Sequence, residues 1–302
     1  MRARHSAPQW HERMIATAAR ATSLLRAARA TRTAAAAAPW CGPVARRRAG
    51  HPAASRPRAA RFAAVAMAQW EAVTFGATGA PGVETGAKDA PGVMLIQEWW
   101  GVNVEIKALG ARLAEKGYRV LIPDIYNGKL ALDAEEANHE MSNLDWPKAL
   151  GEICDGVAYL HDTGSAKVGI TGTCMGGALA LAAAAKCGGL ACAAPFYGTP
   201  DPGLADVSTI TIPVQAHFGE LDNLAGFSDK AAADGLRDAL AANAEAEVFL
   251  YPGAGHGFMN AAPDRPRITP EVAAETGFPP ANPEAQAAAW ERVVSFFAKH
   301  LK

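Results

Sequence analysis

The stretch Val168-Gly169-Ile170-Thr171-Gly172-Thr173-Cys174-Met175-Gly176-Gly177 decides the fold of this chain. Its first half is apolar and an alanine-rich run over residues 178–182 follows it, so the pattern predicts a strand, a tight turn and a helix. Glycines two positions before and after Cys174 permit the close strand-to-helix approach of a nucleophile elbow. A cysteine at the amino end of a helix, where N–H groups favour a thiolate, suggests a thiol nucleophile. A buried structural cysteine is the alternative.

Short apolar runs alternate with helical patterns along the rest of the chain. This alternation predicts an α/β fold, with a mostly parallel central sheet and helices on both faces. The glycine- and proline-rich residues 76–86 indicate a turn region. The expected strands cover residues 70–75, 92–97, 119–123, 168–170, 190–197, 214–218 and 248–251, and the expected helices cover residues 104–116, 133–143, 147–161, the stretch after Cys174, 229–241 and 283–301.

Four polar residues come directly after strands of this predicted sheet. They are Glu98, Cys174, Asp222 and His256. In parallel sheets the ligand site forms at the carboxyl ends of the strands. We therefore expect these four side chains to share one site.

A hydrolytic thiol needs a base within hydrogen-bond reach and a third group that orients the base. His256 lies in a glycine-bracketed loop that could aim its imidazole at Cys174, and Asp222 could accept a hydrogen bond from the other ring nitrogen. The order nucleophile, acid, histidine is that of the α/β-hydrolase triad. His217 and Glu220 are the nearest competitors, although the apolar strand around His217 favours core packing for that residue.

Four motifs occur in order along the chain. They are Gly-x-Cys-x-Gly-Gly around Cys174, Gln97-Glu98-Trp99-Trp100-Gly101-Val102-Asn103, the sequence GYRVLIPDIY over residues 117–126, and Gly255-His256-Gly257-Phe258. Together they resemble the dienelactone hydrolase family, the carboxymethylenebutenolidases, of the α/β-hydrolase superfamily. The likeness covers nearly all of residues 70–302.

The resemblance implies an α/β-hydrolase fold and a triad of Cys174, His256 and Asp222. It also implies that Glu98 holds the thiol neutral at rest and takes part in generating the thiolate when substrate binds. The expected oxyanion hole consists of the backbone N–H of Met175, which follows the nucleophile, and a second N–H from the loop at Trp99.

The chain departs from the family where two arginines bind the substrate carboxylate. The first matching position is Asn260, and the second falls near His139 or Glu140, so neither offers a guanidinium. Arg265 and Arg267 lie close to the first position in the sequence and are possible substitutes. An ester or lactone with a less acidic acyl group is therefore as plausible a substrate as dienelactone.

Aromatic residues near the predicted strand ends are candidates for the pocket wall, although many such residues belong to ordinary core. The candidates that we select are Trp100, Tyr126, Tyr197 and Phe258.

Residues 1–67 differ from the rest of the chain in composition. They contain 13 arginines, no lysine and one acidic residue, whereas residues 68–302 hold 16 basic and 29 acidic residues. An arginine-rich, acid-poor segment is typical of an organelle transit peptide, and we favour the chloroplast over the mitochondrion. A nucleic-acid-binding arm is the alternative, but no basic segment follows it in the rest of the chain. Residues 68–302 are then expected to form one α/β-hydrolase domain.

Several classes of function receive no support from the sequence. No apolar run outside the alanine tracts is long enough to span a membrane, and no spacing suggests a metal site or an organic cofactor. Five cysteines show no paired spacing, so free thiols in a reducing compartment are expected. The oligomeric state stays open.

The sequence thus predicts a cysteine-dependent hydrolase of small esters or lactones that acts through an acyl-enzyme. A thioesterase or a glycan-acting hydrolase on the same fold is one alternative. A non-catalytic member, in which Cys174 is a redox-sensitive thiol or the pocket only binds a ligand, is another.

Overall fold

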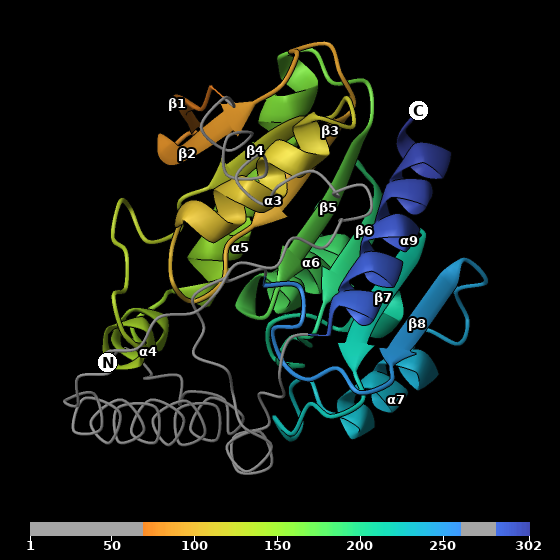
Figure 1. Ribbon diagram of the computed structural model, residues 1–302. Coiled ribbons are helices and arrows are strands. Elements are labelled where there is room, and N and C mark those ends of the chain that lie inside the picture. Colours follow the sequence, from red (N-terminus) through yellow and green to blue (C-terminus); the bar gives the residue numbers. More distant parts are fainter. Residues whose placement is uncertain (1–68, 261–281) are drawn as a thin grey trace, which may run out of the picture.

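The computed structural model describes residues 69–260 and 282–302. The expected transit peptide over residues 1–67 and the candidates Arg265 and Arg267 lie outside these residues. The described chain forms an eight-stranded sheet in the order β1-β2-β4-β3-β5-β6-β7-β8 (Figure 1). Its strands are β1 (Glu71–Phe75), β2 (Ala80–Thr85), β3 (Gly92–Ile96), β4 (Arg119–Pro123), β5 (Val168–Thr173), β6 (Leu190–Phe196), β7 (Val214–Gly219) and β8 (Ala246–Tyr251).

The sheet is mostly parallel, as predicted. Strand β2 pairs antiparallel with both β1 and β4, while every neighbouring pair from β4 to β8 runs parallel. Strands β3, β4 and β5 are buried along their whole length, because helices cover both faces of the sheet. The carboxyl ends of the parallel strands consequently lie at one edge, where the predicted site residues follow them.

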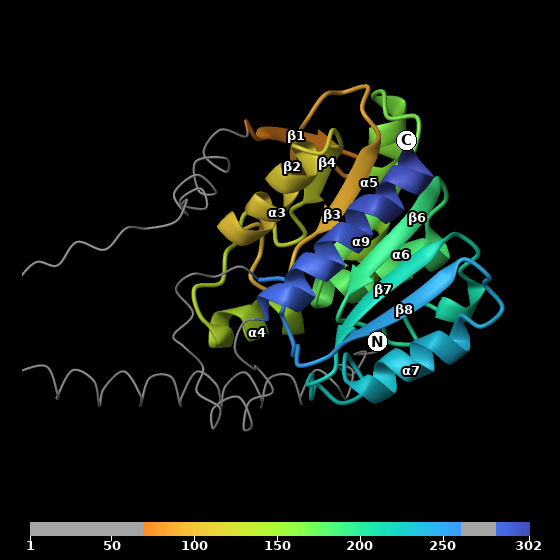
Figure 2. The ribbon, with the colours of Figure 1, turned by 45° about the vertical axis from the view of Figure 1, so that its right-hand side comes forward.

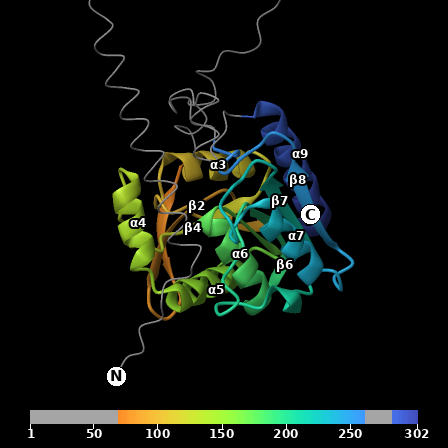
Figure 3. The same cartoon turned by 90° about the horizontal axis from the view of Figure 1, so that it is seen from below.

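Helices lie on both faces of the sheet, which confirms the predicted layers. Helices α3 and α9 cover one face and α5 and α6 cover the other (Figures 2 and 3), while α7 packs against β7 and β8. The helices are α3 (Val104–Ala114), α4 (Ala134–Ser142), α5 (Trp146–Asp162), α6 (Met175–Lys186), α7 (Lys230–Ala239) and α9 (Pro283–Leu301), with a 3-10 turn η1 (Val207–Thr209).

Side-chain caps fix where most of these helices begin. At five helices an Asp or Asn side chain accepts a hydrogen bond from a backbone N–H of the first turn, which satisfies a donor that the helix cannot pair. Helix α6 differs, because its first position is preceded by Cys174, whose side chain makes no such bond. The nucleophile candidate thus occupies the place that a cap fills elsewhere. The caps are Asn103, Asp133, Asp145, Asp229 and Asn282.

Strand β2 corrects the expectation of a turn over residues 76–86. Only residues 76–79 form a turn, and the rest of that stretch is mostly strand. The carbonyl of Pro81 accepts a hydrogen bond from Asp124 N at 2.8 Å, and a Cβ at Gly82 would lie 2.9 Å from the carbonyl oxygen of Ile122. Pairing with β1 and β4 therefore outweighs the local preference of glycine and proline for turns.

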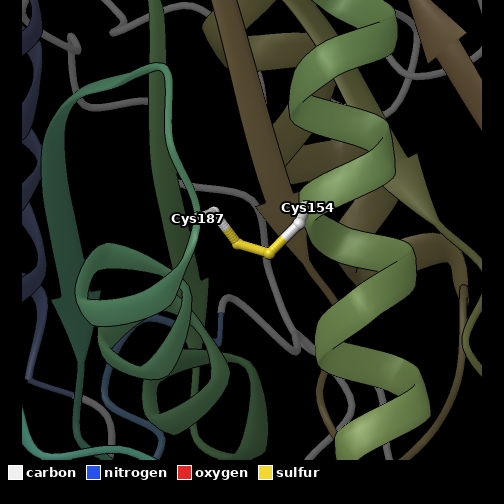
Figure 4. Close-up of a disulfide and its surroundings, with 2 residues drawn as sticks. All are labelled: Cys154 and Cys187. Atoms are coloured by element: carbon white, nitrogen blue, oxygen red, sulfur yellow. A yellow bond between two sulfur atoms is a disulfide. The ribbon is translucent and has the colours of Figure 1, made fainter.

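A disulfide joins Cys154 in α5 to Cys187 at the end of α6, so the expectation of free thiols is wrong for this pair (Figure 4). The two Cα atoms are 5.1 Å apart, within the range that a disulfide needs. Their sequence separation of 33 gave no signal, because the packing of α5 beside α6 brings them together. Among the described residues Cys174 and Cys192 are free, and Cys41 lies outside them.

Candidate active site

The turn between β5 and α6 has the geometry of a nucleophile elbow. Cys174 has a positive φ of 55°, a backbone conformation that residues other than glycine rarely adopt. A Cβ at Gly172 would lie 2.4 Å from the carbonyl oxygen of Gly176, and a Cβ at Gly176 would lie 2.3 Å from that of Ile96. The predicted need for glycine on both sides of Cys174 is confirmed, because backbone occupies the space that a side chain would take.

Hydrogen bonds connect Cys174, His256 and Asp222 in a row. His256 Nε2 lies 3.1 Å from Cys174 Sγ, and His256 Nδ1 lies 2.8 Å from Asp222 Oδ2. The three residues are only 4%, 9% and 5% exposed, respectively. The thiol therefore has a potential base in contact with it, and that base has a carboxylate partner shielded from water.

The loops that carry Asp222 and His256 are fastened to each other. Leu221 N donates to the carbonyl of Ala254 at 2.8 Å, and a Cβ at Gly219 would lie 2.5 Å from that same oxygen. The exposed Glu220 accepts a hydrogen bond from Gly253 N at 3.1 Å. Glu220 thus contacts the backbone of the histidine loop, whereas Asp222 contacts the imidazole itself.

The electrostatic environment keeps the thiol protonated at rest. Burial raises the pKa of Cys174, and the charge of Glu98 raises it further. Contact with His256 and a hydrogen bond from the Met175 N–H lower this pKa but do not outweigh burial. The hydrogen bond from the first N–H of α6, on which the thiolate expectation partly rested, is therefore outweighed by the desolvation of the sulfur.

The imidazole is a stronger base than an ordinary histidine. Burial alone would disfavour its charged form, but the negative charge of Asp222, and that of Cys174 once it is a thiolate, raise the pKa of His256 well above its usual value. The hydrogen bond to Asp222 acts in the same direction. A proton that leaves the thiol would therefore find a favourable acceptor at His256 Nε2.

Glu98 follows β3, two residues beyond its last residue, and is held by an amide. Asn260 Nδ2 donates to both carboxylate oxygens, at 3.3 and 3.1 Å, and Glu98 is 8% exposed. Asn260 stands at the position where the resemblance would place an arginine. The structure therefore gives Glu98 a neutral partner on this side.

Met175 and Trp99, the expected donors of an oxyanion hole, occupy different settings. Met175 is the first residue of α6 and its N–H hydrogen-bonds the sulfur of Cys174. Trp99 is buried just after β3, with its indole packed edge-on against Trp100 at 5.0 Å between ring centroids. Trp100 itself is half-buried.

The other three predicted aromatic residues lie against the triad or next to it. The ring of Tyr197 packs edge-on against that of His256 at 5.1 Å, and Phe258 packs on Tyr197 at 5.4 Å. The hydroxyl of Tyr126 donates to Met175 Sδ at 3.4 Å. These three side chains are buried, so they brace the site more than they line an open pocket.

His217, the competing histidine, belongs to the core as predicted. It is fully buried in β7, where its Nδ1 lies 2.8 Å from the hydroxyl of Tyr251. Burial, with a smaller effect of Arg292, lowers the pKa of His217 to about 3. Its ring stacks on Phe196 and Phe249, so it remains a neutral packing group.

The sequence-based prediction missed Ser228. This fully buried residue lies just before α7, and its Oγ is 3.1 Å from His256 Nδ1. A serine beside Asp229, the helix cap, carries the ordinary pattern of a helix start, so no sequence signal distinguishes it.

Other features of the described residues add no second centre. Within residues 69–260 and 282–302 the structure has no group of three or more His, Cys, Asp or Glu placed to hold a metal ion. The same residues form no helix with the length and apolarity of a membrane span. Surface hollows of about 700 and 630 Å³ lie between β8 and α9 and beside β2 and α3, and none of the four predicted catalytic residues lines them.

Comparisons with known proteins agree with this geometry. Residues 80–301 match the model of the dienelactone hydrolase family. The putative carboxymethylenebutenolidase of Aquifex aeolicus is 28% identical over 223 residues, covering 70% of this chain and 89% of that protein. The carboxymethylenebutenolidase of Rhodococcus opacus is 29% identical over 234 residues, covering 72% of this chain and 84% of that protein.

A solved structure shares the architecture as well. The putative dienelactone hydrolase of Klebsiella pneumoniae aligns with a TM-score of 0.61 and 24% identity, covering 77% of this chain and 99% of that one. This likeness supports the α/β-hydrolase fold, and the family match extends over most of the chain. The chain therefore belongs to the dienelactone hydrolase family of α/β-hydrolases.

Proposed function

We propose that this protein hydrolyses small carboxylic esters or lactones, with Cys174 as the nucleophile. The observation that carries the proposal is the row of hydrogen bonds from Cys174 Sγ through His256 to Asp222. A nucleophile in contact with a base, which a third group orients, is the arrangement that acyl transfer requires.

In the first half of the proposed reaction the thiol attacks the ester carbonyl. The thiol proton moves to His256 Nε2 as the carbon–sulfur bond forms, and the imidazolium is stabilised by Asp222. The N–H groups of Met175 and Trp99 are the proposed donors to the oxyanion. When the carbon–oxygen bond breaks, the leaving oxygen takes the proton from Nε2, and a lactone ring opens.

In the second half water resolves the acyl-enzyme. His256 Nε2 takes a proton from the water while the hydroxide adds to the acyl carbon, and the same proton then returns to the departing sulfur. Because the resting thiol has a raised pKa, its activation must coincide with substrate binding. We assign Glu98 the role of keeping the thiol neutral until substrate binds, since its charge disfavours the thiolate and Asn260 holds its carboxylate.

The proposed acyl group is neutral or weakly acidic. The Asn260 amide can donate hydrogen bonds but adds no positive charge, so it gives a substrate carboxylate no ion pair. The half-buried Trp100, which follows Glu98 and Trp99 after β3, favours an apolar acyl or leaving group. The curated relatives named carboxymethylenebutenolidase make a lactone the natural first class to assay.

The alternatives differ in how well they fit this site. A thioesterase or a glycan-acting hydrolase would use the same three residues, so only substrate profiling separates them from the proposal. A redox-sensitive thiol requires an accessible thiolate. Cys174 is buried and its pKa is raised, both of which count against a redox role.

The decisive experiment compares two cysteine variants in hydrolysis of p-nitrophenyl acetate. Cys174→Ala is expected to abolish turnover, because it removes the nucleophile. Cys192→Ala is the matched control, because Cys192 is also free and buried but its thiol has a pKa raised to about 12 and touches none of the triad. Full activity of Cys174→Ala would refute the proposal.

A further inference from the structure

The hydroxyl of Ser228 contacts the same imidazole nitrogen as Asp222. Ser228 Oγ lies 3.1 Å from His256 Nδ1, and Asp222 Oδ2 lies 2.8 Å from it. Ser228 is fully buried, so its hydroxyl has no access to bulk water and needs a partner inside the protein. His256 is therefore met at Nδ1 by two oxygens, one of them on a side chain to which the family comparison gives no role.

The backbone fixes the position of this hydroxyl. Ser228 N donates to the carbonyl of Leu224 at 3.0 Å, and the neighbouring carbonyl of Phe227 accepts hydrogen bonds from both the backbone and the hydroxyl of Thr199. The loop between β7 and α7 is thereby fastened to the segment after β6. Ser228 Oγ thus approaches the imidazole from a rigid support.

Aromatic rings pack around the imidazole on its other sides. The ring of His256 lies 5.1 Å from that of Tyr197 and 6.2 Å from that of Phe227, between centroids. The titratable groups that face it are Asp222 and Cys174, together with Tyr197, while Glu98 acts on the thiol beyond. Ser228 adds a neutral hydroxyl that lies within hydrogen-bond distance of Nδ1.

A hydroxyl can do what a carboxylate cannot at this nitrogen. An ionised carboxylate only accepts, whereas a serine hydroxyl accepts from Nδ1–H and can also donate to an unprotonated Nδ1. Ser228 can consequently keep contact with the ring in either protonation state. When Nε2 takes the thiol proton, the Nδ1–H has two oxygen acceptors. Both oxygens then stabilise the positive charge of the imidazolium ring.

We propose that Ser228 is a positioning residue, which holds the His256 ring toward Cys174 and stabilises its imidazolium together with Asp222. The inference rests on the proposed hydrolase function, because it assigns Ser228 a role in the proton transfer from Cys174 to His256. It adds a fourth side chain to the row formed by Cys174, His256 and Asp222.

Ser228→Ala tests this role with p-nitrophenyl acetate as the probe. We expect kcat to fall about 3- to 10-fold, the size of one typical hydrogen bond, because Asp222 still holds the imidazolium, with KM within about twofold. The acid limb of the kcat/KM profile should move to lower pH, because the imidazolium loses an acceptor. A kcat and a pH profile equal to those of the unmodified protein would overturn the proposal.

Thr199→Val is the matched control. It removes the hydroxyl that donates to the carbonyl of Phe227 in the same loop, but this hydroxyl does not contact His256. The pH profile of Thr199→Val is expected to match that of the unmodified protein. An equal displacement of the acid limb in both variants would show that loop loosening alone is responsible, and the proposal would fail.

Two further variants keep the test decisive. Ser228→Cys replaces the hydroxyl by a thiol of similar size, which is a weaker hydrogen-bond acceptor. It should therefore displace the acid limb in the direction expected for Ser228→Ala. This variant supplies the test if Ser228→Ala does not fold. Cys174→Ala reports separately on the proposed function. If it loses turnover while Ser228→Ala and Ser228→Cys both behave as the unmodified protein, the hydrolase assignment stands and the role of Ser228 is wrong.

Discussion

The amide nitrogen of Asn260 donates hydrogen bonds to both carboxylate oxygens of Glu98, at 3.3 and 3.1 Å. Glu98 is nearly buried and its charge reaches the Cys174 thiol, so this amide holds the group that helps keep the nucleophile protonated. Removing the amide with Asn260→Ala should release the carboxylate. We expect kcat/KM for p-nitrophenyl acetate to fall about 10- to 100-fold, in line with the loss of a hydrogen bond to a charged group.

The control for this prediction is Asn260→Gln, which retains the amide on a longer side chain and should keep more activity than alanine. Comparable losses in the two variants would mean that packing, and not the amide, is what Glu98 requires. Circular dichroism of each variant checks that the fold is intact.

The charge of residue 260 should also decide which substrates are accepted. Asn260→Arg adds a guanidinium beside Glu98, where it could pair with a substrate carboxylate. We expect the ratio of kcat/KM for cis- or trans-dienelactone to that for p-nitrophenyl acetate to rise at least about tenfold. An unchanged ratio in Asn260→Arg would show that this position does not set acyl-group selectivity, and Asn260→Gln supplies the neutral comparison.

The acid limb of the pH profile should lie above the usual titration of histidine. Activity requires the Cys174–His256 pair to lose a proton, and Asp222 raises the pKa of His256, so turnover should decline as the pH falls through a value above about 6.5. Asp222→Asn removes the negative charge. It should move this limb to lower pH and reduce kcat by at least about 100-fold. A limb that stays in place would exclude Asp222 as the partner of the imidazole.

Most of the sheet and the site could be predicted because their signals are local. The apolar strands, the polar residues that follow them and the glycines around Cys174 are all properties of short segments, and the parallel topology then brings the strand ends together. The order of Cys174, Asp222 and His256 adds a pattern over a longer range.

The features that were missed depend on contacts between distant segments. Pro81 belongs to a strand because Thr74 of β1 pairs with it on one side and Asp124 N, just after β4, donates to its carbonyl on the other. Cys154 meets Cys187 through helix packing, and Ser228 reaches His256 across 28 positions of sequence. The raised pKa of Cys174 depends on burial, which a helix-terminus argument does not include.

The close approach of β3 to α6 predicts a strict need for glycine at position 176. A Cβ there would lie 2.3 Å from the carbonyl oxygen of Ile96, and backbone cannot move aside as a flexible side chain can. Gly176→Ala should lower the free energy of unfolding by about 1 to 3 kcal/mol, and urea denaturation measures this change. Gly188→Ala, where a Cβ meets nothing within 4 Å, should change it by less than about 0.5 kcal/mol. Equal effects would contradict the model of the elbow.

The disulfide between Cys154 and Cys187 should stabilise the fold without taking part in the chemistry. It closes a loop with a sequence separation of 33, and the entropy that this closure removes from the unfolded chain corresponds to about 3 to 4 kcal/mol. Both cysteines are half-buried, so a reductant can reach them. The thermal midpoint should therefore fall when dithiothreitol is added to the unmodified protein. Cys154→Ser should show the lower midpoint from the start and no further response to dithiothreitol, while its kcat at 25 °C stays unchanged. A midpoint of the unmodified protein that does not respond to reduction would show that the bond is either absent or without effect on stability, and labelling of free thiols in the unfolded protein distinguishes these two results.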